Sequence, residues 1–281
     1  MSRQKTGPGR SLMAIERRRK IHDLALRDGS VSVSDLAALL GVAQNTVRAD
    51  LDALQREGKV RRSHGGAVLN GSGGPTPPYA QMRATHLEEK SWIGAAAARL
   101  LPSSGCVFIN AGSTTLQLAA AITGEQQISV TTNSPELALL VSRFPLVTVD
   151  LLGGRMIRES QETDGSLSGD AIDSLFWDVV FYGMTALDEQ HGITSASHAP
   201  AMLDRRILAH TRKVVGLCDS SKLGLYANAR VGPVEILDVL VTDANARPQH
   251  LRMLREHGVE VVLASREGVH PEPETAGGDR P

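Results

Sequence analysis

A Gly- and Pro-rich stretch, NGSGGPTPP at positions 70–78, divides the chain into two parts and most limits how it can fold. It has no large apolar side chain to contribute to a core, and its composition is typical of a linker. The chain's 281 residues also exceed the usual size of a single core. We therefore predict domains at 14–69 and 79–265, a flexible linker at 70–78 between them, and a disordered tail at 266–281.

The two parts carry net charges of opposite sign. Residues 1–70 hold 13 Lys or Arg against 7 Asp or Glu, whereas residues 71–281 hold 17 against 24. A basic part attached to an acidic body indicates a polyanion partner for the N-terminal part alone.

Several classes of protein are excluded by composition. Cys106 and Cys218 lie in apolar runs without CxxC spacing or a nearby histidine pair, which argues against a disulfide framework or a metal site. No segment approaches the roughly 18 apolar residues needed to span a bilayer, and the first residues lack the apolar run of a signal peptide. We expect a cytoplasmic protein with no membrane association, no metal and no cofactor.

The N-terminal part begins with two predicted helices. The first, over 14–29, has a basic flank at 17–20, which fits either a solvated helix face or a DNA contact. The second, over 35–40, is expected to be capped by Ser34 and to end at Gly41.

A third predicted helix, over 44–57, is amphipathic. Val47, Leu51 and Leu54 form its apolar stripe. The opposite stripe holds side chains that can read bases, since Gln and Asn pair with adenine and Arg with guanine or phosphate. The base-reading candidates by type are Gln44, Asn45, Arg48 and Gln55.

A β-hairpin is predicted after the third helix, with strands at 59–62 and 67–69 and a turn at 63–66. Its basic residues are Arg61, Arg62 and His64. We expect these to reach the phosphate backbone, although a histidine alone is also common in turns. Three helices followed by a hairpin form a winged helix-turn-helix, which places its third helix in the major groove.

The C-terminal part alternates apolar strands with helices. Strands are predicted at 106–110, 128–132, 146–152, 178–183, 213–219, 236–243 and 259–264. Helices are predicted at 81–101, 114–122, 134–144, 199–211 and 247–258. This alternation predicts an α/β fold, a mainly parallel Rossmann-like sheet with helices on both faces.

Loops rich in glycine and hydroxyl side chains follow several of these strands. Open parallel sheets bind ligands at the carboxyl ends of their strands, so these loops are the expected ligand site. In NAGSTT, Gly112 is expected to allow a tight turn, and the three following residues offer hydroxyls and free N–H groups to a phosphate. Comparable loops lie at 131–134, 151–154 and 219–224. Helix capping explains any one loop, but all four together with Lys222 favour an anion pocket.

The N-terminal motifs resemble those of DeoR-type bacterial transcription regulators, whose pattern runs S-x-x-T-[IV]-R-R-D-L and ends R-x-H-G-G-A. The matching residues are Thr46, Val47, Arg48, Asp50, Leu51, Arg62, His64, Gly65, Gly66 and Ala67. Ala43 replaces the family's usual Ser, which removes a helix N-cap worth about 1 kcal/mol, and Ala49 replaces a second Arg. The expected DNA-binding residues are Gln44, Asn45, Thr46, Arg48, Arg61, Arg62 and His64.

The C-terminal part is similar to the sensor domain of the same family in the spacing of EK, AGSTT, TTNS, LLGG, FYG and DSSK, so the resemblance covers about 14–245. It implies a fold related to ribose-5-phosphate isomerase and glucosamine-phosphate deaminase enzymes, and a phosphorylated sugar as effector. The effector-binding residues that it implies are Gly112, Ser113, Thr114, Thr115, Asn133, Gly153, Gly154 and Lys222. The family often has Asp where Asn110 stands.

The leading hypothesis is a sequence-specific transcription regulator, usually a repressor in this family, of a sugar or polyol catabolic operon. A phosphorylated sugar changes DNA occupancy only through different affinities for two arrangements of the DNA-binding domains. The expected partners are double-stranded operator DNA, a phosphorylated sugar and further copies of the chain in a dimer or tetramer, because half-sites are read by symmetric copies.

Two other classes of protein fit parts of the sequence. An isomerase or deaminase with an added DNA-binding domain needs a carboxylate base beside the sugar. The acids near strand ends are Asp150, Asp188, Glu189 and Asp219, whereas Asn110 offers no base. A nucleoid-type DNA binder without an effector leaves the acidic body unexplained. We therefore expect a regulator and not an enzyme.

Overall fold

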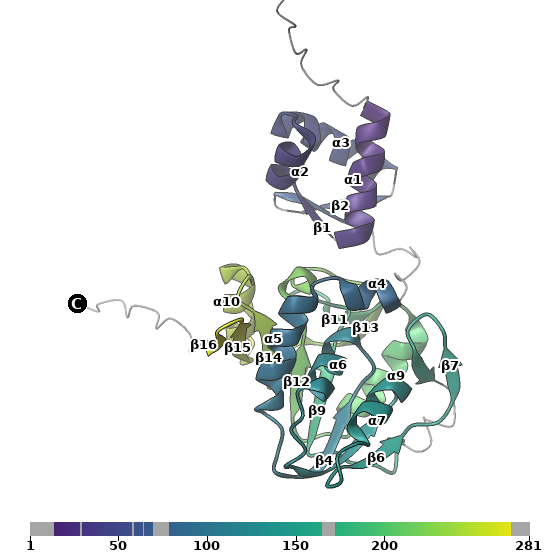
Figure 1. The fold of residues 1–281 in the computed structure, drawn as a ribbon. Helices are drawn as coiled ribbons and strands as arrows, with labels where there is room; N and C mark the ends of the chain where they lie inside the picture. The colour runs from purple at the N-terminus through teal and green to yellow at the C-terminus, as the bar shows by residue number, and fades with distance from the viewer. Residues whose placement is uncertain are drawn as a thin grey trace, which may run out of the picture. The chain divides into compact units, whose positions relative to one another are not determined.

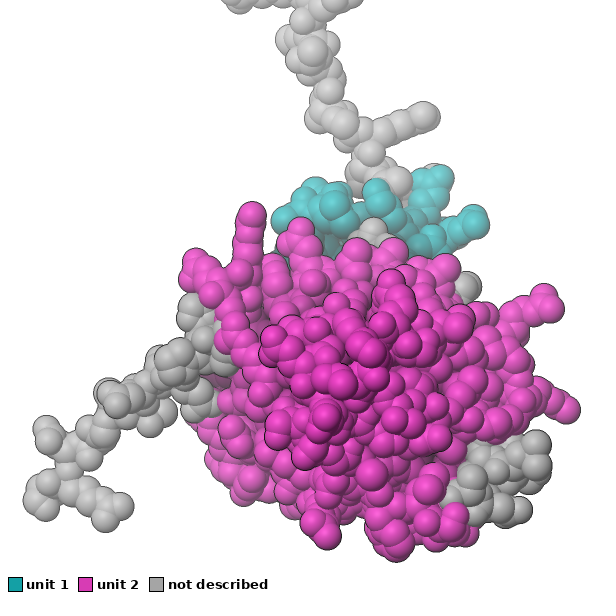
Figure 2. Space-filling model, turned by 60° about the horizontal axis from the view of Figure 1, so that its bottom comes forward, with its two compact units in different colours: residues 1–70 teal, residues 71–281 magenta. Residues whose placement is uncertain are grey.

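The computed structural model describes residues 14–28, 30–57, 59–63, 65–69, 79–164 and 172–270. The chain divides between Asn70 and Gly71 into two compact units, which Figure 2 shows in different colours. The stretch predicted as a linker lies outside the described residues. Each unit has its own apolar core.

The N-terminal unit combines three helices with an antiparallel sheet of order β1-β3-β2 (Figure 1). Its elements are α1 (Ala14–Asp28), β1 (Ser30–Ser32), α2 (Val33–Leu40), α3 (Gln44–Arg56), β2 (Val60–Ser63) and β3 (Gly66–Leu69). A Cβ at Gly66 would lie 2.1 Å from the Val31 carbonyl oxygen, so β1 and β3 can approach this closely only with glycine there. The winged helix-turn-helix prediction is confirmed.

One apolar core holds this unit together. It contains Ile21, Ala25, Val33, Leu36, Val47, Leu51, Leu54, Val60 and Ala67. The prediction that Ser34 caps α2 is wrong, because the Ser32 hydroxyl accepts the Asp35 N–H at 3.1 Å and the helix begins at Val33. Ala43 gives α3 no side-chain cap, and Gly41 ends α2 with a left-handed φ of 64°.

The C-terminal unit is built on an eight-stranded sheet of order β16-β15-β14-β12-β9-β4-β5-β6. All neighbours pair in parallel except β16, which is antiparallel to β15. The strands are β4 (Ser104–Ile109), β5 (Gln127–Thr132), β6 (Thr148–Leu151), β9 (Val179–Gly183), β12 (Val214–Leu217), β14 (Val239–Asp243), β15 (Glu260–Ser265) and β16 (Gly268–His270). Each of the seven parallel strands overlaps one predicted strand, and β14 begins three residues later than predicted because residues 234–236 form a 3-10 turn.

Helices cover both faces of this sheet (Figure 1). Those on one face are α5 (Leu87–Ala98), α6 (Ser113–Ala120) and α7 (Pro135–Val141), and those on the other are α9 (His198–Ala209) and α10 (Pro248–Glu256). Alternate strand residues supply the two cores, since Val107 and Ile109 pack with α5 and α6 while Phe108 packs on the opposite side. The predicted fold class is confirmed.

Two small antiparallel sheets extend the unit beyond the predicted elements. They are formed by β10 (Ala186–Asp188), β11 (Gly192–Ser195) and β13 (Ala229–Gly232), and by β7 (Arg155–Ile157) and β8 (Glu162–Asp164). The sequence analysis missed all five strands, because three or four residues are too few to show a reliable alternation.

Two predicted boundaries are wrong. The helix predicted over 81–101 is two helices, α4 (Tyr79–Ala84) and α5, because His86 adopts a left-handed φ of 53° between them. The tail predicted to be disordered from 266 instead begins with β16, whose Gly268 pairs with Ser265 of β15. Residues 271–281 lie outside the described residues.

Candidate functional site

The exposed face of α3 carries the predicted base-reading residues. Gln44, Asn45 and Arg48 are exposed, whereas Val47 and Leu51 on the opposite side are buried. The Arg48 guanidinium donates to the side-chain oxygens of Asn45 at 2.7 Å and Gln44 at 3.2 Å. The structure therefore joins all three side chains in one hydrogen-bonded group on the face that a recognition helix presents to the major groove.

The other predicted DNA contacts lie on the first turn of α3 and on the wing. Thr46 is half-buried. Arg62 on β2 places its Nε 3.2 Å from an Asp52 carboxylate oxygen on α3, so an ion pair links the wing to the helix. The side chain of Arg61 and all of His64 lie outside the described residues, and their DNA contacts stay predictions.

Arg17 does not belong to the solvated basic flank in which the sequence placed it. It is 8% exposed, and its guanidinium donates to the two carboxylate oxygens of Asp50 at 2.5 and 3.2 Å. Asp50 is itself buried on α3. This bidentate pair fixes α3 against α1, and sequence reasoning missed it because the partners are 33 positions apart.

Asn110 joins the carboxyl ends of two neighbouring strands, β4 and β9. Its Nδ2 donates to the Gly183 carbonyl at 2.9 Å, and its Oδ1 accepts the Gly183 N–H at 2.8 Å. An ionised carboxylate could not make both bonds, because it only accepts. The asparagine that stands where the DeoR pattern often has Asp is thus a link between strands.

The predicted phosphate cradle lies where α6 begins. Ser113 is half-buried, and Thr114 and Thr115 are buried. The Thr115 hydroxyl donates to the Asn110 carbonyl at 2.7 Å, so it holds the loop, whereas the Thr114 hydroxyl has no partner among the described residues. The chain bends at 111–112 immediately before α6, and Gly112, the N-cap residue, has an extended φ of 172° there.

Asn133 and the two glycines shape the loops around this edge. Asn133 is buried; its Oδ1 accepts a backbone N–H of the loop before α6 at 2.7 Å, and its Nδ2 donates to Glu162 at 3.2 Å. Gly153 is exposed. At Gly154 a Cβ would lie 2.5 Å from the Asp164 carbonyl oxygen, so glycine allows β7 and β8 to approach.

Lys222 lies in a short 3-10 turn, Ser220–Lys222, that follows β12. Its Nζ donates to the Met184 carbonyl at 2.9 Å and lies 3.9 Å from a carboxylate oxygen of Asp219. Burial raises the pKa of Asp219, but Lys222, the Ser221 hydroxyl and Lys90 outweigh it, so the pKa of this carboxyl lies below its usual value. Asp219 is therefore a buried anion held between cations.

Lys90 of α5 is a second cation at this edge. It is 3% exposed, and its Nζ donates to the carbonyls of Met82 at 2.5 Å and Thr85 at 2.7 Å. Burial lowers the pKa of Lys90 to about 8, with repulsion from Lys222 acting in the same direction and attraction to Asp219 opposing both. Sequence reasoning noted the EK pair but gave Lys90 no role, since nothing local shows that it is buried.

A buried carboxyl, Asp204 on α9, also went unpredicted. It accepts the Tyr182 hydroxyl hydrogen bond at 2.7 Å. Burial raises the pKa of Asp204 to about 7; the Tyr182 bond lowers it, and the charge of Glu162 raises it further. Its helical spacing from Ala201 and Leu208, both buried, was the available signal.

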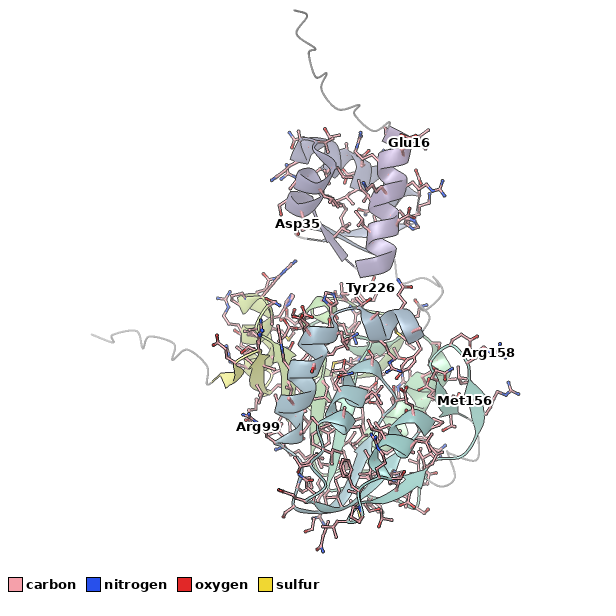
Figure 3. The ribbon with its side chains drawn as sticks, viewed as in Figure 1. Glu16, Asp35, Arg99, Met156, Arg158 and Tyr226 are labelled. Atoms are coloured by element: carbon pink, nitrogen blue, oxygen red, sulfur yellow. The ribbon has the colours of Figure 1, made fainter. Side chains whose placement is uncertain are left out.

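An aromatic and histidine pair lies near the same edge. His191 stacks on Tyr226 with ring centroids 4.0 Å apart, and its Nδ1 lies 3.0 Å from an Asp188 carboxylate oxygen. Figure 3 shows Tyr226 at the end of the C-terminal unit where the parallel strands finish. The stacking holds the loop that follows Lys222 against the turn between β10 and β11.

The part of the chain that the structure describes contains no group of three or more His, Cys, Asp or Glu side chains placed to hold a metal ion. Cys106 and Cys218 are free thiols. Within the same described ranges, no helix is both long and apolar enough to cross a membrane.

A winged helix-turn-helix on one unit and a doubly covered α/β sheet on the other define the class of two-domain DNA-binding transcription regulators. Residues 17–72 match the family described as the DeoR-like helix-turn-helix domain. Residues 85–244 match the DeoR C terminal sensor domain. The chain belongs to the DeoR family of transcriptional regulators, which confirms the resemblance seen in its motifs.

Curated relatives align with this chain over nearly their whole length. The HTH-type transcriptional regulator GlpR of Haloferax volcanii is 31% identical, over 89% of this chain and 98% of its own. The regulator GolR of Listeria innocua is 28% identical, over 90% and 100%. The glycerol-3-phosphate regulon repressor of Escherichia coli K12 is 27% identical, over 88% and 98%. The prediction of a DNA-binding transcription regulator, and not an enzyme, is confirmed.

Proposed function

We propose that this regulator represses a sugar or polyol catabolic operon in the cytoplasm, and that a phosphorylated sugar at the carboxyl edge of the C-terminal sheet sets its DNA affinity. The observation that carries the proposal is the pair of lysines, Lys90 and Lys222, beside the buried carboxylate of Asp219. The name of the E. coli relative contains a phosphorylated polyol, which supports the choice of effector.

The charges around the two lysines suit a phosphate group. The ammonium groups of Lys90 and Lys222 lie at a partly buried site, where attraction to an anion is stronger than in bulk water. The first turn of α6 adds backbone N–H groups and the positive end of the helix dipole. Thr114 offers a buried hydroxyl without a partner among the described residues. The proposed effector residues are Lys90, Gly112, Ser113, Thr114, Thr115, Asn133, Gly153, Gly154 and Lys222.

The DNA contacts follow the winged-helix geometry. We place Gln44, Asn45 and Arg48 against base edges in the major groove, with Thr46 beside them and the wing residues Arg61, Arg62 and His64 against phosphates. In the free protein, Arg48 is hydrogen-bonded to Asn45 and Gln44. These bonds must be exchanged for bonds to DNA when the three side chains contact the bases. Two copies reading two half-sites imply at least a dimer.

Fluorescence anisotropy on the upstream DNA of the chain's own gene tests the effector assignment. A panel of sugar phosphates is added to the full chain, with each unphosphorylated sugar and inorganic phosphate as references. We expect one phosphorylated compound to change the DNA affinity and Lys222→Met to lose that response by tenfold or more. Lys213→Met is the matched control, because Lys213 is an exposed lysine at the opposite end of β12. An equal loss in both variants contradicts the proposed site.

The pH dependence of effector binding gives an independent check. Since burial lowers the pKa of Lys90 to about 8, its charge is present below that pH and disappears above it. A sugar phosphate keeps its full charge in this range, because its second pKa is about 6. We therefore expect effector affinity to weaken between pH 7 and pH 9 by calorimetry, and to stay flat in Lys90→Met.

A further inference from the structure

One surface of the C-terminal unit, here called the α7 patch, is formed by Leu116, Ala120, Glu136, Leu139, Leu140 and Arg143. Its most exposed member is Leu139, at 74%, a value comparable only to Ile15 and Phe176 among the described large apolar residues. A groove of about 440 Å³ lies beside it. The groove is lined by the residues of the patch together with Arg83 and Gln117.

Opposite charges stand at the two ends of α7. Glu136 is in its first turn, and Arg143 lies two residues beyond its last residue, Val141. The midpoint between these charges falls between Leu139 and Leu140. If two copies of α7 pack antiparallel about a two-fold axis through that midpoint, each Glu136 lies beside the Arg143 of the other copy. The leucines then meet at the centre, as an isologous interface requires.

We propose that a second copy of this chain docks on the α7 patch in this antiparallel arrangement, with Leu139 of each copy in the groove beside α7 of the other. This step rests on the two-copy regulator proposed above and names the surface that joins the copies. Burial of the leucines supplies the main driving force, and the two charge pairs fix the direction of packing.

The hydrogen bonds that Glu136 and Arg143 already form still allow each group to pair with a charge on a second copy. Glu136 accepts the Arg83 guanidinium at 2.7 Å and the Tyr79 hydroxyl at 3.4 Å, and a carboxylate has lone pairs for about four hydrogen bonds. Arg143 is exposed, and its Nε donates to the Leu140 carbonyl at 3.0 Å, which holds the side chain against the end of α7. Glu136 and Arg143 carry opposite charges at equal sequence distances from the midpoint between Leu139 and Leu140. A two-fold axis through that midpoint brings each charge beside its opposite, so the surface is complementary to a second copy of itself.

Sedimentation of the full chain without DNA or effector tests the interface. We expect the wild type to associate and Leu139→Glu to raise the dissociation constant at least tenfold. Phe176→Glu is the matched control, because Phe176 has the same 74% exposure and lies outside the patch. It should leave association unchanged.

Reversing the two charges tests the antiparallel direction. The conclusion comes from comparing two variants with their mixture, so it does not depend on the folding of one variant. Glu136→Arg and Arg143→Glu should each weaken self-association, because each brings like charges together. An equimolar mixture should associate more tightly than either variant alone, since a mixed dimer regains both opposite-charge pairs, and energy transfer between labelled variants measures this.

Three results overturn the interface: a monomeric wild type at tens of micromolar, Leu139→Glu associating like wild type, or a mixture no tighter than its components. Retained DNA binding with a sugar-phosphate response would then leave the proposed function intact, so the two failures are distinguishable.

Discussion

Replacing Asp50 by alanine is expected to destabilise the N-terminal unit more than any exposed substitution on α3. Arg17 and Asp50 are 8% and 5% exposed and are joined by bonds of 2.5 and 3.2 Å. Removal of the carboxylate leaves a buried guanidinium without its counter-ion, which costs about 3–5 kcal/mol. Because single domains are stable by only about 5–15 kcal/mol, little stability would remain in so small a unit.

Asp52 provides a matched control two residues further along the same helix. It also forms an ion pair, 3.2 Å from Arg62, but its side chain is 60% exposed. Exposed pairs contribute about 0–1 kcal/mol, and alanine is the better helix former, so Asp52→Ala should change stability by less than about 1 kcal/mol.

Urea unfolding of the full chain separates the two units. Trp92 and Trp177, the two tryptophans of the chain, both lie in the C-terminal unit, so fluorescence reports that unit alone. Amide hydrogen exchange of α3 reports the other. We expect Asp50→Ala to lower α3 protection sharply while the fluorescence midpoint stays fixed. A loss for Asp50→Ala no larger than that for Asp52→Ala would refute the buried-pair reasoning.

Further predictions concern DNA recognition, pH and backbone approach. Arg48→Ala should weaken specific DNA more than scrambled DNA, whereas Arg62→Ala should weaken both equally and flatten the salt dependence; titrations of both duplexes at two salt concentrations measure this. For Asp204, burial raises the folded-state pKa to about 7, while the unfolded carboxyl ionises near 4, so the unfolding free energy should fall as pH rises through this window. Denaturant unfolding at pH 5 and pH 8 should show a fall of about 2–3 kcal/mol, part of a full change on the order of 4 kcal/mol, and Asp204→Asn should remove it. Gly66→Ala should cost more than about 2 kcal/mol and abolish binding to all DNA, because its Cβ would lie 2.1 Å from the Val31 oxygen; thermal melts and DNA titration check both effects.

Elements with a long local pattern were predictable from the sequence. Most of the parallel strands are short apolar runs that alternate with amphipathic helices in the sequence, and α3 shows a clear apolar stripe, so chain-local spacing was enough. The sequence around α2 could not decide between Ser32 and Ser34 as its N-cap, because either hydroxyl can accept a bond from the first turn of a helix. The β1–β3 pairing, with Ser32 opposite Gly66, holds Ser32 extended in the cap position.

The candidate effector site was only partly predictable. The prediction of a parallel sheet and the carboxyl-end rule placed the loops at 110–115 and 219–224 at one edge, because parallel strands all end at the same edge of a sheet. Lys90 was not assigned a role, since it reaches that edge from a helix on the sheet's face and its burial comes from packing. The hydrogen bonds of Asn110 and Asn133 likewise join residues 73 and 29 positions away.

The sequence by itself determined the two units, the winged helix-turn-helix, the parallel sheet and the DeoR family, because periodicity, glycine turns and motif spacing are local properties of a chain. Only the tertiary structure decided which charges are buried, which are paired and which remain able to bind a partner. Arg17 and Lys90 look like ordinary surface cations in the sequence, yet both are buried in the fold. Burial and pairing depend on residues that are distant in the chain, and these set the cost of a charge and the strength of its interactions.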